Sequence, residues 1–345
     1  MLRYEIERRE FHFKEPAGTS RGIYTRRVCW FVTLRSGDET GVGECAPLPR
    51  LSCDDVADYE PRLQAFCEQL CATGEIDYDG MNAFPSMLFG LETAMAQLRA
   101  HGSFALFDTP FARGEEGIPF NGLVWMGDYE TMARRMEQKL RQGHRCVKIK
   151  IGAIDFNEEL ALIARLRRDF PAADGLQLRV DANGAFSAEN VMAKLEQLAK
   201  YDIHSIEQPI AAGQRSALAE VCRRSPIAVA LDEELIGVNT LEDRQRLLEE
   251  VMPQYIVLKP SLHGGMRGTE QWISEARRRG IGSWITSALE SNIGLNAIAQ
   301  LTARIYGSGI RFAQGLGTGQ LFTDNVDVPL VVRAEGGDVR LFFHA

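Results

Sequence analysis

Charged residues stand at the ends of five successive apolar segments in the middle of this sequence. From the second of the two lysines onward they are spaced 31, 26, 25 and 27 residues apart: Lys148 with Lys150, Asp181, Glu207, Asp232 and Lys259. One strand–helix unit of an eight-unit barrel takes roughly 30 residues, so each charge falls one unit further around such a barrel. Barrel enzymes carry their chemistry at the carboxyl ends of the strands, and we therefore expect one shared active site.

The alternation of residues within these segments predicts that the charges point inward. In residues 146–151 large apolar side chains alternate with Lys148 and Lys150, and side chains at i and i+2 share a face of a strand. Residues 176–181 and 227–232 repeat this pattern. A single acidic residue at a strand end is more often a helix cap or a solvated residue, but five groups at one spacing favour a common site.

Three of the charged residues form a candidate metal site. Asp181, Glu207 and Asp232 would repel one another in a narrow barrel mouth unless a cation lay between them. Ligands that offer only oxygen suit Mg²⁺, for which Mn²⁺ could substitute, with the remaining positions left to water and substrate. Zinc is disfavoured because no His or Cys falls at a matching strand end.

The lysines indicate proton transfer next to a carboxylate. Lys148 and Lys150 belong to the second strand and Lys259 to the sixth, and these strands lie opposite each other in an eight-stranded ring. Removing a proton beside a carboxylate creates an enediolate, whose charge a metal ion and a nearby ammonium stabilise. The base must be a neutral lysine, and adjacent cations can lower a lysine pKa toward ~7–8. We expect a small anionic carboxylate as substrate.

From residue 119 onward, short apolar segments alternate with amphipathic ones, which is typical of parallel strands joined by helices. The eight candidate strands are residues 120–125, 146–151, 176–181, 203–207, 227–232, 255–259, 283–288 and 311–314. Helix start signals follow several of them, at Asp155, Ser187, Thr240 and Ser291. His204 alternates with Glu207, so we expect it to point outward and to pack.

The first 115 residues predict a different, mixed domain. Residues 28–34 and 41–45 read as a hairpin, and helices are expected near 54–71 and 85–100. Residues 331–343 read as strand again and are expected to fold back onto this domain.

The fold class is therefore α/β, a (β/α)8-type barrel with an α+β N-terminal capping domain. The barrel takes residues 119–329, and the capping domain takes residues 1–115 joined by 330–345. Residues 14–21 and 47–54 are candidate lids that exclude water from the barrel mouth.

The composition excludes several functions. The net charge of −8 argues against nucleic acid as a partner, although a local lysine cluster still suits a small anion. No apolar run approaches the ~18 residues that span a membrane, and the charged N-terminus does not resemble a signal peptide. We expect no membrane contact and a cytoplasmic location.

The seven cysteines contain no Cys-x-x-Cys and are expected to be free thiols. Nothing in the sequence indicates an oligomeric state.

The order of the six charged residues resembles the muconate-lactonizing branch of the enolase superfamily. Within that branch the sequence is similar to the o-succinylbenzoate synthases of menaquinone biosynthesis, and the resemblance covers nearly the whole chain. It rests also on the stretches GECAPLP at 43–49, RVDAN at 179–183, LKPSL at 258–262, SALES at 287–291, GLGTG at 315–319 and TDN at 323–325.

The resemblance implies a lyase that converts 2-succinyl-6-hydroxy-2,4-cyclohexadiene-1-carboxylate into o-succinylbenzoate by a Mg²⁺-dependent syn-dehydration. By position, Lys150 would be the base and would return the proton to the leaving hydroxyl. Lys148 would neutralise charge near the carboxylate, and Lys259 would stabilise the enediolate from the opposite face. Arg179 would support a metal ligand, and the acidic pair after Asp232 has no assigned role.

Two other hypotheses stay open. An N-succinylamino acid racemase or dipeptide epimerase of the same superfamily could use Lys150 and Lys259 as two bases. A non-catalytic barrel that only binds a ligand is disfavoured, because it would have no need of the complete set of charged groups.

Overall fold

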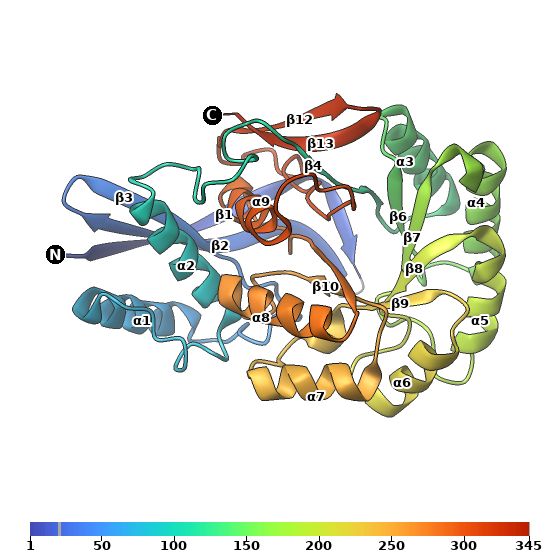
Figure 1. The fold of residues 1–345 in the computed structure, drawn as a ribbon, viewed down its shortest axis with the longest axis horizontal. Helices are drawn as coiled ribbons and strands as arrows, with labels where there is room; N and C mark the ends of the chain where they lie inside the picture. Colours follow the sequence, from blue (N-terminus) through green and yellow to red (C-terminus); the bar gives the residue numbers. More distant parts are fainter. Residues whose placement is uncertain (20–21, 345) are drawn as a thin grey trace.

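Three strands and two helices form the N-terminal domain of the computed structural model, which describes residues 1–19 and 22–344 (Figure 1). Their bounds are β1 (Arg3–Thr19), β2 (Gly22–Ser36), β3 (Glu39–Cys45), α1 (Tyr59–Thr73) and α2 (Pro85–Arg99). The strands form an antiparallel sheet in the order β1-β2-β3. The predicted hairpin is therefore β2 with β3, and both predicted helices are present.

Helix α2 lies directly on β3 because two glycines leave room for its backbone. A Cβ atom added to Gly41 would lie 2.1 Å from the carbonyl oxygen of Ala94. A Cβ atom added to Gly43 would lie 1.8 Å from the carbonyl oxygen of Gly90. A larger residue at either position would force the helix off the sheet. The side chains between them form the core of this domain and include Val32 and Leu91.

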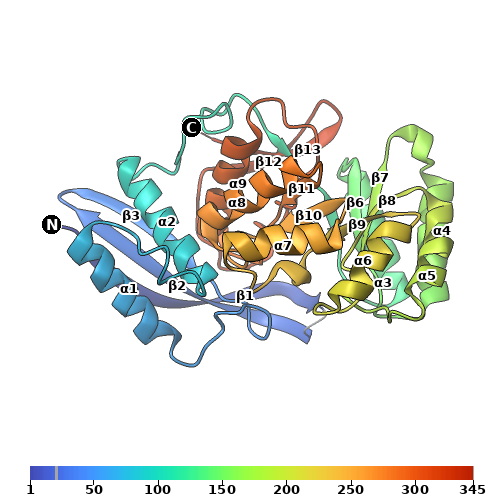
Figure 2. The same ribbon diagram turned by 60° about the horizontal axis from the view of Figure 1, so that its bottom comes forward.

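In the described residues, seven parallel strands form the barrel sheet and seven α-helices lie around it. Figure 2 shows these helices on the outside of the strands. The strands are β5 (Gly122–Val124), β6 (Cys146–Lys150), β7 (Gln177–Asp181), β8 (Ile203–Glu207), β9 (Ala228–Leu231), β10 (Tyr255–Leu258) and β11 (Gly282–Ile285). The helices are α3 (Tyr129–Arg141), α4 (Phe156–Asp169), α5 (Val191–Leu198), α6 (Arg215–Arg224), α7 (Leu241–Val251), α8 (Gly265–Arg278) and α9 (Asn292–Tyr306). Neighbours in the sheet follow the order of the sequence.

The eighth expected strand closes the ring through single bridges instead of a continuous ladder. Gln314 pairs in parallel with Phe120, and Gly315 pairs with Thr286. The Gln314 side chain also accepts a hydrogen bond from the Ile285 N–H at 2.8 Å. The eighth strand was predicted at the right place in the sequence, but Gln314 and Gly315 do not form a strand ladder. We call the line along which they join the ends of the sheet, between β5 and β11, the seam of the barrel.

The C-terminal hairpin lies at the base of the barrel. Its strands β12 (Leu330–Glu335) and β13 (Asp338–Phe343) form a sheet with β4 (Ile118–Pro119). We expected these residues to join the N-terminal domain. The Arg145 guanidinium instead donates to the Gly337 carbonyl at 2.8 Å, and Leu341 and Phe343 pack into the barrel core. The apolar face of the hairpin therefore finds its partners in the barrel.

Three of the four predicted helix starts are N-caps. Asp155, Thr240 and Ser291 each accept a hydrogen bond from a backbone N–H in the first turn of α4, α7 and α9. Ser187 is not an N-cap, because α5 begins only at Val191.

A bulge in β8 reverses the expected direction of His204. Leu178 pairs with Ile203, but the next residue, Arg179, pairs with Ser205, so His204 is an extra residue in its strand. Its ring lies 5.1 and 5.5 Å from two aromatic rings of the barrel floor, and burial lowers its pKa to about 4. The outward direction was wrong, although His204 does pack against other side chains.

The cysteines and the helices agree with the expectations from the sequence. All seven cysteines are free thiols, and five of them are buried. None of the helices in the described part of the chain has the length and apolar character that crossing a bilayer requires.

Candidate active site

The six predicted site residues meet at the carboxyl ends of strands β6 to β10. The strand register pairs Lys150 with Asp181 and Asp181 with Glu207. The three carboxylates are at most 1% exposed, and Lys148 and Lys150 are 9% and 8% exposed. The structure therefore brings together the charges that their spacing predicted.

The ammonium groups lie directly against the carboxylates. The Lys148 Nζ atom is 3.2 Å from Asp181 Oδ2 and 3.0 Å from Glu207 Oε2. The Lys150 Nζ atom is 3.2 Å from the same Asp181 oxygen. From the other side of the ring, Lys259 forms an ion pair with Asp232. Positive charge thus faces the carboxylates from β6 and from the end of β10, directly before Lys259.

Burial and opposite charge compete at each of these groups. Burial acts to lower the pKa of Lys148, but Glu207 and Asp181 outweigh it and raise this pKa above its usual value. Burial acts to raise the pKa of Asp181, but Lys150 and Lys148 hold it below its usual value. Burial and Asp181 raise the pKa of Glu207 to about 8, and Lys148 offsets this only in part.

We expected nearby cations to lower lysine pKa values. Around Lys148 and Lys259 the carboxylates are the closer neighbours. Burial acts to lower the pKa of Lys259 as well, but Asp232 outweighs it and raises this pKa. Both ammonium groups are therefore stabilised by their carboxylate partners.

The carboxylates fit a magnesium site in their chemistry. Among residues 1–19 and 22–344 no three His, Cys, Asp or Glu side chains stand grouped as a ready metal site. The Lys148 ammonium lies between Asp181 and Glu207 and donates to both. Within the same residues, Asp232 Oδ1 is buried without a hydrogen-bond partner. A buried carboxylate oxygen without a partner costs free energy that a cation would recover. An all-oxygen donor set suits Mg²⁺.

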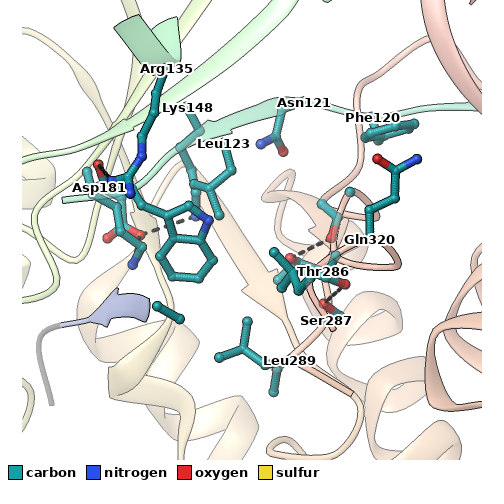
Figure 3. Close-up of a pocket in the computed structure, with 18 of the residues that line it drawn as sticks. Phe120, Asn121, Leu123, Arg135, Lys148, Asp181, Thr286, Ser287, Leu289 and Gln320 are labelled. Atoms are coloured by element: carbon teal, nitrogen blue, oxygen red, sulfur yellow. Dashed lines mark hydrogen bonds and ion pairs between the residues drawn. The ribbon is translucent and has the colours of Figure 1, made fainter. Parts of the chain in front are cut away.

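A cavity of about 330 Å³ opens above these groups (Figure 3). Both predicted lid segments border it, since Glu15 and Ala17 line it from β1 and Leu48 and Leu51 from the loop after β3. Ser20 and Arg21 of the first segment lie outside the described residues. Six lysines and arginines line the cavity, against three acidic residues: Lys14, Arg135, Lys139, Lys148, Lys150 and Lys259 against Glu15, Asp181 and Glu233. This excess of positive charge suits an anionic substrate.

Residues 131–336 match the family model described as enolase C-terminal domain-like, and residues 20–98 match that of the MenC N-terminal domain. An o-succinylbenzoate synthase from Desulfotalea psychrophila is 44% identical, over 97% of this chain and 98% of the relative. The chain belongs to the o-succinylbenzoate synthase family of the enolase superfamily. The resemblance seen in the sequence is therefore confirmed.

Solved structures of this synthase family have the same fold. The crystal structure of MenC from Desulfotalea psychrophila has a TM-score of 0.80 and 40% identity, and the match covers 98% of this chain and 99% of that one. The o-succinylbenzoate synthase from Thermosynechococcus elongatus, with Mg in its active site, has a TM-score of 0.71 and 26% identity, over 91% and 92% of the two chains.

A network that the sequence did not indicate connects Lys150 to Glu233. The Lys150 ammonium donates to Asn183 Oδ1 at 2.7 Å, and the Asn183 amide donates to Glu233 Oε1 at 2.9 Å. Glu233 lines the cavity, whereas Glu234 accepts the Gly213 N–H outside it. The acidic residue that faces the synthase-family site is therefore Glu233. The signal in the sequence that could have placed Glu233 in the site was its position directly after Asp232.

Arg179 lies in the barrel floor, below the carboxylates. Its guanidinium sits 4.4 Å from the ring centres of both Trp284 and Phe312, and it donates to the Ala313 carbonyl at 2.9 Å. It therefore fastens β7 to the segment that closes the ring. Within the described residues no hydrogen bond joins it to Asp181.

Arg27 of β2 ties the two domains together at the rim of the cavity. It is 1% exposed, and its guanidinium donates to four carbonyl groups, those of Ala46 and Pro47 and those of Ala288 and Leu289. The first pair precedes the lid residues Leu48 and Leu51, and the second pair lines the cavity from the loop after β11. The sequence did not indicate Arg27, because its partner Leu289 lies 262 residues away along the chain.

Proposed function

We propose that this protein is an o-succinylbenzoate synthase, which removes water from 2-succinyl-6-hydroxy-2,4-cyclohexadiene-1-carboxylate. The observation that carries the proposal is the 44% identity to such a synthase along 97% of the chain. The cavity adds support, since lysines on β6 and β10 face it from opposite sides and its lining carries excess positive charge. The product ring is aromatic, so only one proton and one hydroxyl need to leave.

In this proposal Lys150 takes the proton from the ring carbon that bears the carboxylate. The same ammonium then returns a proton to the neighbouring hydroxyl, which leaves as water from the same face. Lys259 stays charged on the opposite face and stabilises the enediolate by its field. Lys148 holds positive charge beside the substrate carboxylate, and Asn183 fixes the position of the Lys150 ammonium.

We infer that Asp181, Glu207 and Asp232 hold the metal ion. When bound, Mg²⁺ supplies positive charge at the carboxylate oxygens on which the enediolate charge develops. We propose that Mn²⁺ can replace it, because both ions prefer oxygen ligands. The cytoplasm is the proposed location.

The test incubates purified protein and Mg²⁺ with the cyclohexadiene substrate and follows the aromatic product by absorbance. A parallel reaction in D₂O follows exchange of the α-proton of each enantiomer of an N-succinyl amino acid. Fast aromatisation with slow exchange supports the synthase. Fast exchange of both enantiomers without aromatisation would replace it with the racemase.

A further inference from the structure

The cavity continues beyond the catalytic lysines into the seam of the barrel. Its lining passes from Lys148 through Leu123 and Asn121 to Gly317. In the described part of the chain, single bridges join the closing segment to Thr286, directly after β11, and to Phe120, two residues before β5. The seam therefore offers a second space for ligand next to the catalytic centre.

Asn121 is a buried polar side chain within this seam. It is 5% exposed, and its backbone N–H donates to the Gln314 carbonyl at 2.9 Å. Its side-chain amide has no hydrogen-bond partner among residues 1–19 and 22–344. Figure 3 shows this amide reaching from the strand into the open space between Leu123 and Thr286. Because this amide lines the cavity and no side chain or carbonyl of the described residues hydrogen-bonds it, it is free to hydrogen-bond a ligand group there.

The position of Asn121 relative to the lysines fits a substrate with two carboxylates. Leu123 is the register partner of Lys148, and Asn121 lies one inward-facing step below it. Two residues of strand correspond to about 7 Å. A substrate whose first carboxylate lies beside Lys148 could extend a short flexible chain over that distance. The opposite wall is polar as well, since the hydroxyls of Ser287 and Thr318 lie 2.6 Å apart there.

We propose that the Asn121 amide donates a hydrogen bond to the terminal carboxylate of the succinyl chain and so determines specificity for succinyl-bearing substrates. This inference rests on the proposed function and names the residue that recognises the part of the substrate remote from the reaction. A neutral donor binds this carboxylate without a second buried charge to desolvate. Asn121 takes no part in the proton transfer.

The test compares two ligands that differ only in the succinyl chain, o-succinylbenzoate and benzoate. Their affinities are measured by calorimetry in Mg²⁺ for the wild type, Asn121→Asp and Asn121→Leu. The aspartate keeps the size of the side chain but repels a carboxylate, and the leucine removes the donor. We expect o-succinylbenzoate to bind roughly 10- to 100-fold more weakly to Asn121→Asp and roughly 10-fold more weakly to Asn121→Leu. Benzoate binding should not change.

Asn157→Asp is the matched control, because it makes the same amide-to-carboxylate change at an exposed residue of α4. It should leave both affinities as in the wild type. Equal weakening of both ligands by the Asn121 variants would overturn the proposal in favour of a general role in shaping the cavity. Unchanged o-succinylbenzoate affinity would also overturn the proposal, because the succinyl chain would then bind away from Asn121. If Asn121→Asp does not fold, Asn121→Leu alone decides.

A separate turnover assay keeps this inference distinct from the proposed function. Wild-type protein that binds o-succinylbenzoate through Asn121 but does not aromatise the cyclohexadiene substrate would refute the dehydration only. Wild-type protein that does aromatise it, with affinities indifferent to Asn121, would refute the inference only.

Discussion

Lys148 and Lys150 lie one inward step apart on the same strand, yet they have different surroundings. Lys148 lies between two carboxylates, Asp181 and Glu207. Lys150 meets the same Asp181, but its ammonium also lies 5.8 Å from the ring centre of Trp125. Lys150 thus lies beside an aromatic side chain that also lines the cavity.

These surroundings predict different losses for the two lysines. Lys150→Ala should lower kcat by roughly 10²- to 10⁴-fold, since it removes the proposed general base. Lys148→Ala should chiefly raise KM, because it removes the charge that we propose lies beside the substrate carboxylate. Steady-state kinetics on both variants provide the measurement. A nearly normal Lys150→Ala beside an inactive Lys148→Ala would show that the roles are exchanged.

Lys259 distinguishes a synthase from a racemase. A dehydration needs only a fixed charge at this position, whereas a racemase needs a base on both faces. Arginine keeps the charge and is effectively always protonated, so Lys259→Arg should retain part of the aromatisation activity. Aromatisation is followed by absorbance, and α-proton exchange of N-succinyl amino acids by NMR in D₂O. Efficient exchange of both enantiomers by wild type, with selective loss of one in the variant, would instead establish two-base chemistry.

At the scale of the elements, two carboxylates of the N-terminal domain cap helices of the barrel. Glu44 of β3 accepts hydrogen bonds from the N–H groups of Ser291 at 2.8 Å and Gly294 at 2.9 Å, at the start of α9. Glu92 of α2 accepts the N–H of Arg267 at 3.0 Å, in the first turn of α8. Helix N-termini favour negative charge, so these contacts attach the domains and stabilise the helices together.

Loss of such a cap should destabilise the protein. Glu44→Ala leaves buried N–H groups without an acceptor, and we expect the free energy of unfolding to fall by about 1–3 kcal/mol. Chemical denaturation followed by circular dichroism measures this change. Glu75→Ala is the control, because this exposed residue should change stability by no more than about 0.5 kcal/mol. Equal effects of the two substitutions would contradict a capping role for Glu44.

The sequence predicted those elements whose signal is local and periodic. Strand spacing placed the lysines and carboxylates of the candidate site, because one repeat unit recurs at nearly constant length. It did not predict β1, in which charged residues mask the apolar face that includes Ile6. It also missed the bulge at His204, since a single extra residue in a ladder leaves the composition unchanged. Contacts such as those of Arg27 depend on loops that only the folded chain brings together.

At the scale of the whole molecule, the substrate cavity depends on how the domains meet. Its walls come from both domains, and Arg27 holds the lid loop and the barrel loop to each other through four carbonyls. A misplaced wall should affect substrate binding before it affects chemistry.

Arg27→Met should therefore raise KM by roughly tenfold while changing kcat less. Arg26→Met is the matched control, because this neighbouring side chain is 65% exposed and pairs with Glu10 at the surface. Steady-state kinetics on both variants, with thermal unfolding as a check of the fold, provide the measurement. A fall in kcat alone, with KM unchanged, would argue against a positioning role.

The metal prediction also concerns the molecule as a whole. Chelation should abolish turnover, and added Mg²⁺ should restore it. Mg²⁺ should also raise the melting temperature, because an ion that binds only the native state stabilises it by mass action. Glu207→Gln should reduce this thermal shift while the fold stays intact by circular dichroism. Full turnover after verified metal removal would refute the assignment of Asp181, Glu207 and Asp232.

The seam of the barrel affects how the chain folds while the ribosome synthesises it. The segment that closes the ring, around Gln314, is synthesised after all seven laddered strands. Until it emerges, β5 and β11 are open sheet edges, which are sites of intermolecular pairing in unfinished chains. Nascent chains of this protein should therefore depend on chaperones until the end of translation, and circular permutants that begin near residue 308 should depend on them less.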